Sequence, residues 1–330
     1  MNRVLSGIAP SGAFTLGNYL GALRQWVDLQ DDADVFYCVV DLHALTTEID
    51  PADVRANTID AALNLLAVGL DPERSTLFIQ SHVPEHARLT WLLECTTSIG
   101  ELRRMTQFKD KGKGQEQVRV GLFTYPDLMA ADILLYDANE VPVGDDQRQH
   151  LELTRELAVR FNNRYGETFV VPEAAIPKAG ARVMDLQHPE RKMSKSADSP
   201  LGTIGLLDSD EEIAHKVRRA VTDTDGEMRY DRAAKPGLAN LLDLLAATTG
   251  RTPEAVAKDY TRYGDLKNDV AASLSELLAP VRARRRELED DPGYVTGVLA
   301  AGAAHAHEVA GATYARAADA MGLLPEVVAT

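Results

Sequence analysis

The first 200 residues alternate short apolar runs with longer segments that have the apolar spacing of helices. The short runs cover residues 4–8, 35–40, 76–79 and 141–143, and the helical segments cover residues 17–30, 52–68, 125–136 and 147–161. Short strands that alternate with helices are typical of βαβ units, whose strands lie parallel in one sheet. The pattern therefore predicts an α/β fold with a doubly wound parallel sheet.

The strand signals stop at about residue 203. Helical spacing continues over residues 209–221, 237–249, 252–260, 265–288 and 293–321, and Pro280 is expected to kink or divide one of these helices. A chain of 330 residues has the length of about two domains of roughly 150 residues each. We therefore expect a sheet domain over residues 1–203 and an all-α helical domain over residues 204–330.

Composition and charge restrict the class of protein. The net charge of −15 argues weakly against nucleic-acid binding, and the basic segments 216–219 and 282–286 are each more typical of a solvated helix face. Cys38 and Cys95 form no C-x-x-C pair, so we expect reduced thiols and no protein-bound zinc. The first residues lack the apolar core of a signal peptide, and no stretch of about 18 apolar residues occurs. We therefore expect a cytoplasmic protein that does not enter the membrane.

The segment from Val4 to Asn18 runs from an apolar strand through a Gly/Pro turn into a helix. Ligands of open α/β sheets bind beside the carboxyl ends of the strands, where the free N–H groups of a helix start favour phosphate. Gly7 and Gly12 would let the backbone approach such a ligand closely, and Gly17 would leave room for a base or ribose. An ordinary βα turn with convenient glycines explains the segment equally well.

A second segment, Lys192–Ser196, reads KMSKS and lies between HPER and the loop residues Pro200 and Gly202. Two lysines three positions apart can hold a triphosphate while its α-phosphorus is attacked. Taken alone, a solvated loop of lysine and serine is the better interpretation. The two segments together, about 170 residues apart on either side of a parallel-sheet pattern, are much more specific.

The two segments resemble the signatures of class I aminoacyl-tRNA synthetases, which carry His-x-Gly-His near the N-terminus and KMSKS after the sheet. Here the first signature is Thr15-Leu16-Gly17-Asn18, and the loss of both histidines resembles the bacterial tryptophanyl-tRNA synthetases. The likeness extends through FIQSHVPEH at 78–86, RMTQFKDK at 104–111, MAADILLYDA at 129–138, VPVGDDQRQHLELTRELAVRFN at 141–162 and AVTDTDG at 220–226. The resemblance implies a Rossmann-like catalytic domain that uses ATP with Mg²⁺.

The resemblance also implies an ATP site built from both signatures and from the strand–helix junction at 144–146. Lys192, Lys195, Thr15 and Asn18 would oppose the charge that develops on the leaving pyrophosphate. Capping of the following helix is a second role for the acidic residues of this junction, and Lys111 is as well explained as a solvated loop lysine as by a contact to ATP. The implied ATP-binding residues are Ala9, Pro10, Ser11, Gly17, Asn18, Gly144, Asp145, Asp146, Val183, Lys192, Met193, Ser194, Lys195 and Ser196.

For the amino acid, the resemblance implies that Asp132 accepts the indole N–H of tryptophan. An acid among apolar helix residues is costly if it is buried without a partner, so the alternative is that Asp132 faces water. His43 is explained equally by a place in the core. The implied tryptophan-binding residues are Leu5, Gly7, His43, Tyr125, Met129, Asp132, Val141, Val143 and Gln147.

The implied function is a tryptophan–tRNA ligase that forms tryptophanyl-adenylate from tryptophan and ATP and then transfers the acyl group to tRNA(Trp). The family also implies a homodimer, an anticodon-binding role for residues 204–330, an insertion at about 51–119, and a last helix that packs back on the catalytic domain. Ala9 and Leu5 stand where glutamine and an aromatic residue are common, which suggests an auxiliary copy with altered tolerance to tryptophan analogues. A tyrosyl-tRNA synthetase and a non-catalytic paralogue that binds tryptophan or tRNA as a regulator are the alternatives.

Overall fold

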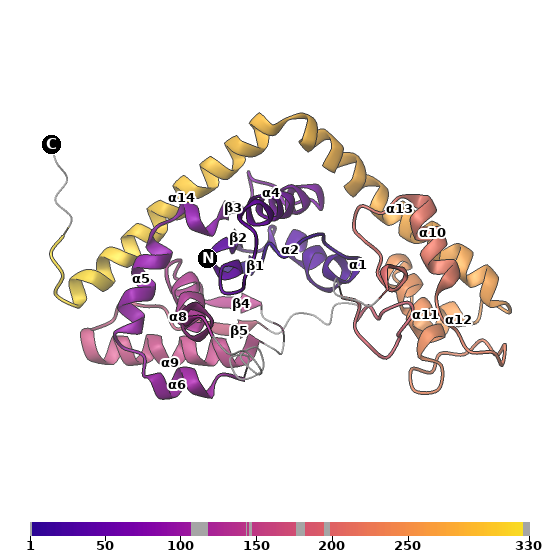
Figure 1. Ribbon diagram of the computed structural model, residues 1–330, viewed down its shortest axis with the longest axis horizontal. Coiled ribbons are helices and arrows are strands. Elements are labelled where there is room, and N and C mark those ends of the chain that lie inside the picture. The colour runs from indigo at the N-terminus through magenta and orange to yellow at the C-terminus, as the bar shows by residue number, and fades with distance from the viewer. Residues whose placement is uncertain are drawn as a thin grey trace.

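The computed structural model describes residues 2–106, 118–142, 144, 147–175, 182–194 and 199–325. Its centre is a five-stranded parallel sheet with the strand order β3-β2-β1-β4-β5 (Figure 1). The strands are β1 (Arg3–Ile8), β2 (Asp34–Val39), β3 (Thr76–Ile79), β4 (Glu140–Pro142) and β5 (Glu173–Ala175). The chain runs from β1 to one edge and then returns to the other side of β1, so the strand order reverses between β1 and β4. Open sheets of this kind bind ligands at that switch point.

This sheet confirms the prediction of a doubly wound, Rossmann-like fold. The sequence analysis did not predict β5, a short edge strand with the sequence Glu-Ala-Ala, which has no β-branched or aromatic residue. The range expected for an insertion, 51–119, contains β3, which pairs with β2 through the register Tyr37–Leu77. That part of the range is therefore integral to the sheet.

Alternate residues of each strand enter two different apolar layers, as the pleat of a strand requires. In β2, Val35, Tyr37 and Val39 face one layer, and Phe36 and Cys38 face the other. The first layer contains α1 (Leu16–Asn18), α2 (Arg24–Leu29) and α4 (Pro51–Ala67), with a π-helical turn at Tyr19–Leu23 between α1 and α2. The second layer contains α5 (Glu85–Glu94), α6 (Ile99–Arg104), α8 (Val120–Leu134) and α9 (Arg148–Tyr165).

The remaining helices are α10 (Asp210–Arg219), α11 (Pro236–Thr249), α12 (Pro253–Ala257), α13 (Tyr263–Asp290) and α14 (Pro292–Ala320). Of the two alternatives expected for Pro280, a kink or a division of the helix, the division is wrong, because α13 is continuous through Pro280. Leu278 and Val281 are buried on either side, whereas Pro280 is exposed. Pro280 therefore lies on the solvent side of α13, and its buried neighbours pack the helix against the core.

The last helix, α14, crosses from the helical part of the molecule to the sheet and lies along β3 and α5 (Figure 1). It comes closest at Gly302, where an added Cβ would lie 1.9 Å from the carbonyl oxygen of Leu77 in β3. Only a residue without a side chain allows this approach, and the helix thereby covers an edge strand of the sheet. None of the helices in the described part of the chain is both long and apolar enough to cross a membrane.

Candidate active site

The first signature forms the turn from β1 into α1. Thr15 caps the helix: its hydroxyl accepts a hydrogen bond from the Asn18 backbone N–H (3.3 Å), and its own backbone N–H donates to Asn18 Oδ1 (2.9 Å). This reciprocal capping box fixes both side chains. The cap uses the acceptor oxygen of the Asn18 side chain, so this side chain would meet a ligand with its amide nitrogen, which is a donor. Ala9, Pro10 and Ser11 precede this turn at the carboxyl end of β1.

The second signature is supported by a short antiparallel hairpin between residues 183 and 193. Met184 pairs with Lys192, and the Met193 N–H donates to the carbonyl oxygen of Val183 over 3.0 Å. The buried amide of Asn240, in α11, bonds both backbone groups of Met184, at 3.0 Å and 2.9 Å. The position of this hairpin therefore depends on the helical part of the molecule. Lys195 and Ser196 lie outside the described residues, as does Lys111.

The structure brings the two signatures together. A Cβ added at Gly17 would lie 3.7 Å from Cβ of Met193, so the first helical turn contacts the KMSKS segment directly. Backbone hydrogen bonds fix this arrangement, from the Leu16 N–H to the Ile204 carbonyl (2.9 Å) and from the Leu206 N–H to the Phe14 carbonyl (2.8 Å). Ser194 belongs to the same arrangement, because its carbonyl accepts a hydrogen bond from the Thr203 hydroxyl.

Asp132 is buried on α8 and has three hydrogen-bonding partners. His43 Nε2 lies 2.7 Å from Oδ2, while Gln80 Nε2 and His86 Nδ1 each lie 2.6 Å from Oδ1. Burial would raise the pKa of this carboxyl, but the charge and hydrogen bond of His43 and the hydrogen bond of His86 outweigh it and hold the pKa below its ordinary value. Asp132 is therefore an ionised acceptor inside the protein, and the interpretation that it faces water is wrong.

Other residues predicted for the tryptophan site lie on the same side of the sheet. Leu5 and Val141 belong to the apolar layer that contains α8, and Met129 packs against it. The ring of His43 meets the ring of Tyr125 edge-on at 6.2 Å, and the Tyr125 hydroxyl lies 2.9 Å from Nε2 of His150. At the end of β1, a Cβ on Gly7 would lie 3.0 Å from Val40, so a larger residue would force that side chain to move.

The junction from β4 into α9 is only partly described. Gly144 accepts a hydrogen bond from the Gln147 N–H over 2.9 Å, while Val143, Asp145 and Asp146 lie outside the described residues. The N-cap of α9 is Gln147, whose side chain makes no capping hydrogen bond, and the helix begins at Arg148. The capping role expected for the acidic residues of this junction falls on Asp145 and Asp146 and therefore stays a prediction.

No site role is predicted from the sequence for Gln80, His86, Tyr136, His150 or Asn240. Gln80 and His86 lie in the segment FIQSHVPEH, which contributed only to the family likeness. Their polar side chains directly follow the buried strand β3, and that position was the available signal for a site. Among the described residues, no group of three or more His, Cys, Asp or Glu side chains is arranged to hold a metal ion.

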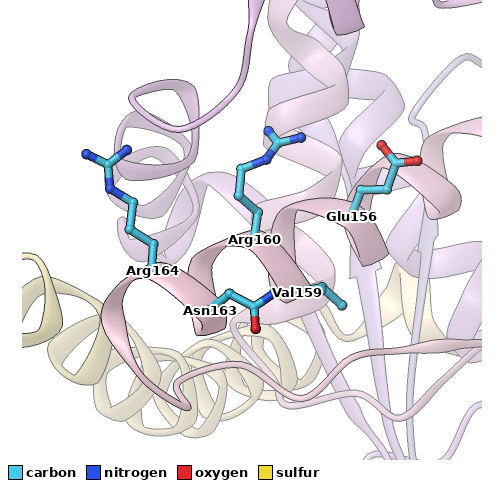
Figure 2. A pocket seen from close by; sticks show the side chains of 5 residues that line it. All are labelled: Glu156, Val159, Arg160, Asn163 and Arg164. Carbon is cyan, nitrogen blue, oxygen red and sulfur yellow. The ribbon is translucent and has the colours of Figure 1, made fainter.

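Two surface hollows lie apart from the Asp132 cluster. One, of about 470 Å³, is lined by a single face of α9 (Figure 2). Arg160 of this face also forms an ion pair with Glu101 of α6. The lining of this hollow contains no residue predicted for the site. The second, of about 700 Å³, lies between α4, Ala13 of the first turn, and Arg285 of α13. The lining residues of the first hollow are Glu156, Val159, Arg160, Asn163 and Arg164.

Residues 1–279 match the family described as tRNA synthetases class I (W and Y). Two curated relatives from Streptomyces avermitilis, "Tryptophan--tRNA ligase 2" and "Tryptophan--tRNA ligase 1", are 56% and 54% identical, each match covering 98% of this chain and 97% and 99% of the relative. Tryptophanyl-tRNA synthetase from Mycoplasma pneumoniae superposes with a TM-score of 0.88 at 38% identity, covering 98% of both chains. The Campylobacter jejuni enzyme complexed with ADP and tryptophan gives 0.84 at 33% identity, covering 97% of this chain and 100% of that one.

Proposed function

The chain belongs to the class I tRNA synthetases of the tryptophan and tyrosine family, and from this membership we propose that it is a tryptophan–tRNA ligase. It activates L-tryptophan with ATP to tryptophanyl-adenylate and transfers the acyl group to tRNA(Trp), releasing AMP and pyrophosphate. The observation that carries the choice of amino acid is the buried, ionised Asp132 on α8. An ionised acceptor held inside the protein fits the ring N–H of an indole.

In the first step, the tryptophan carboxylate attacks the α-phosphorus of Mg·ATP, and the bond to the leaving pyrophosphate breaks. The carboxylate is already ionised at neutral pH, since its reference pKa is near 3.5, and no protein base is needed. The protein's contribution is positioning and charge stabilisation. Lys192 and Lys195 supply positive charge, and the capped helix start at Thr15–Asn18 supplies N–H donors. The contact between Gly17 and Met193 supports this joint role of the two signatures.

The nucleotide site proposed here extends from the turn after β1 to the 183–193 hairpin. Val183 offers a backbone contact to adenine, and the junction at 144–146 contacts the adenosine. In the second step, a terminal ribose hydroxyl of the tRNA takes the acyl group from the adenylate. Residues 204–330 would then bind the anticodon, and Mg²⁺ arrives and leaves with the nucleotide. All of this chemistry takes place in the cytoplasm.

The partner in the assembly is a second copy of the chain. Trp91 and Ile99 are 66% and 63% exposed, and Val159 on the neighbouring face of α9 is 46% exposed. Large apolar side chains gathered at the surface mark protein–protein contacts. Trp91→Glu should convert a dimer to a monomer by light scattering, whereas Leu45→Glu, at another exposed apolar residue, should leave the mass unchanged. A wild-type mass of one chain would contradict the proposed dimer.

The direct test of the activity is ATP–pyrophosphate exchange, with tryptophan and tyrosine in parallel. Exchange with tryptophan alone is expected. Exchange with tyrosine would redirect the assignment to the tyrosyl enzyme, and the absence of exchange with both would favour a regulatory paralogue. Lys195→Ala should slow adenylate formation far more than it weakens tryptophan binding, with the exposed Lys258→Ala as the control. Equal losses in both measurements would exclude a role of Lys195 in the transition state.

The presence of ligases 1 and 2 in Streptomyces avermitilis supports the proposal that this chain is an auxiliary copy with altered analogue tolerance. Ala9 removes a polar side chain at the carboxyl end of β1, and Leu5 replaces an aromatic ring in the layer behind it. The Ala9→Gln variant should change the constants for ATP or tryptophan and the response to tryptophan analogues. Unchanged constants and inhibition would show that position 9 does not set this tolerance.

A further inference from the structure

The residues around Asp132 form two layers that differ in exposure. His43 and Tyr125 keep some accessible surface, with 16% of the His43 side chain exposed, so they line the open side of the cluster. Gln80, His86 and Tyr136 are completely buried at 0% exposure. Residues without accessible surface do not line a site that a small molecule enters. The three therefore lie behind Asp132 and can act on a substrate only through it.

The inner layer fixes the orientation of each of its members. Gln80 Oε1 accepts the backbone N–H of Leu42 at 3.1 Å, so the amide nitrogen must be the atom that donates to Asp132. His86 Nε2 lies 2.8 Å from the hydroxyl of Tyr136. The ionised carboxylate of Asp132 can only accept, so His86 donates to it from Nδ1. In the neutral ring, Nε2 then accepts the proton of the Tyr136 hydroxyl. Burial, together with the charges of Cys38, Asp132 and Glu85, raises the pKa of Tyr136, which favours this protonated hydroxyl.

The acceptor sites of the Asp132 carboxylate determine where a ligand can donate a hydrogen bond. Each carboxylate oxygen has about two lone-pair sites. Among the residues that the structure describes, Gln80 and His86 donate to Oδ1 and fill it, whereas His43 is the only partner of Oδ2. The free acceptor site is thus on Oδ2, the oxygen shared with the partly exposed His43.

We propose that His86, Gln80 and Tyr136 are positioning residues that set the enzyme's selectivity for a ring N–H. Gln80 and His86 saturate Oδ1 of Asp132, Tyr136 holds His86 in place, and the open site of Oδ2 is thereby directed to the substrate. This inference rests on the proposed tryptophan site. Gln80 has a second role, because it hydrogen-bonds both Asp132 and the backbone N–H of Leu42, the residue before His43. Selectivity then depends on three side chains that never touch the amino acid.

The test compares tryptophan with its analogue in which sulfur replaces the ring nitrogen, by ATP–pyrophosphate exchange. His86→Leu removes a hydrogen bond to a charged group, so the KM for tryptophan should rise roughly tenfold or more, whereas the KM for the analogue should change little. His86→Asn places an amide donor near the position of Nδ1 and should restore most of the preference. Phe161→Leu, in the same apolar layer but outside the cluster, is the control for lost stability.

Asp132→Leu, which has no acceptor, separates the positioning role of the inner layer from the proposed tryptophan site. If it abolishes the preference for tryptophan while His86→Leu leaves the preference unchanged, the inner layer has no positioning role and the proposed tryptophan site stands. If Asp132→Leu also leaves the preference unchanged, the tryptophan site itself is wrong. If the His86→Leu variant does not fold, the same comparison of tryptophan with its analogue is made with the Tyr136→Phe variant. A loss of preference for tryptophan supports the proposal, and equal changes for both substrates overturn it.

Discussion

Asp132 in the sheet part and Lys235 at the start of α11 are both buried charged side chains, exposed by 4% and 2%. Lys235 Nζ contacts Asp223, Asp225, the Glu227 carbonyl and the Tyr263 hydroxyl. An ammonium has three protons, so four acceptors saturate it. Burial would lower the pKa of Lys235, but the hydrogen bonds to Asp225, Tyr263 and Asp223 outweigh it and raise the pKa. The three partners of Asp132 in the described part of the chain leave one of its acceptor sites open.

The difference shows how a buried charge used for structure can be told from one available to a ligand. The partners of Lys235 lie in one region of the helical part and occupy all three N–H donors of its ammonium group. The partners of Asp132 come from three separate elements and leave one site on the more exposed side. A buried charged side chain with an unused hydrogen-bonding site indicates a binding site more strongly than a fully bonded one does. A buried polar group without a partner costs stability, and a ligand that bonds to it removes this cost.

The largest expected effect on stability is that of Lys235→Met. The change leaves Asp223 and Asp225 without their counter-charge in a partly buried cluster, and breaking such a cluster by removing one partner is strongly destabilising. Thermal unfolding should show a pronounced fall in Tm, while the tryptophan preference of the folded enzyme stays close to wild type. The exposed Lys258→Met is the matched control. An equal Tm for the two variants would contradict a structural role for Lys235.

Asp127 is a third buried titratable side chain, and its replacement should change stability by an intermediate amount. Thr97 bonds one of its oxygens at 2.7 Å, and Oδ2 is buried with no hydrogen-bond partner among the described residues. Burial raises the pKa of Asp127 to about 6 against the opposing bond of Thr97, with Glu94 and Glu101 adding to the rise. The folded state therefore holds this proton more tightly than the unfolded state. Its ionisation costs stability as the pH rises from about 4 to about 6.

Asp127→Asn should remove this cost and keep the bond to Thr97. Relative to wild type, the variant should gain up to about 3 kcal/mol at neutral pH and nothing at about pH 4, since one pKa unit corresponds to about 1.4 kcal/mol. Urea unfolding at a series of pH values measures the difference, and the exposed Asp32→Asn serves as the control. A difference that does not vary with pH would show that Asp127 is not the titrating group.

The smallest expected effect is that of removing one tyrosine hydroxyl from each of the two clusters. Tyr136→Phe and Tyr263→Phe each remove one hydroxyl that bonds the charged cluster, directly at Lys235 or through His86 at Asp132. Each should cost about 1 kcal/mol of stability. Only Tyr136→Phe should also raise the KM for tryptophan, and a similar rise in Tyr263→Phe would remove the distinction between the two clusters.

The sequence predicted the sheet well because its signals are local. The apolar run at 76–79 coincides with β3, and Pro51 following Asp50 marks the start of α4, where the Asp50 side chain caps the Ala52 N–H. The prediction failed at β5, whose residues have little strand preference, and at Pro280, where packing outweighs the local break. Both failures occur where tertiary contacts decide the backbone.

By itself, the sequence determined the alternation of strands and helices and the chemical identity of the two signatures, because periodicity and motif spacing are properties of neighbouring residues. Only the tertiary structure decided which donors surround Asp132 and which side chains hold the 183–193 hairpin. His43 and Asp132 are 89 positions apart, and Asn240 and Met184 are 56 apart. Such contacts form when elements pack, so no local pattern specifies them, and the free acceptor site on Asp132 exists only in the folded chain.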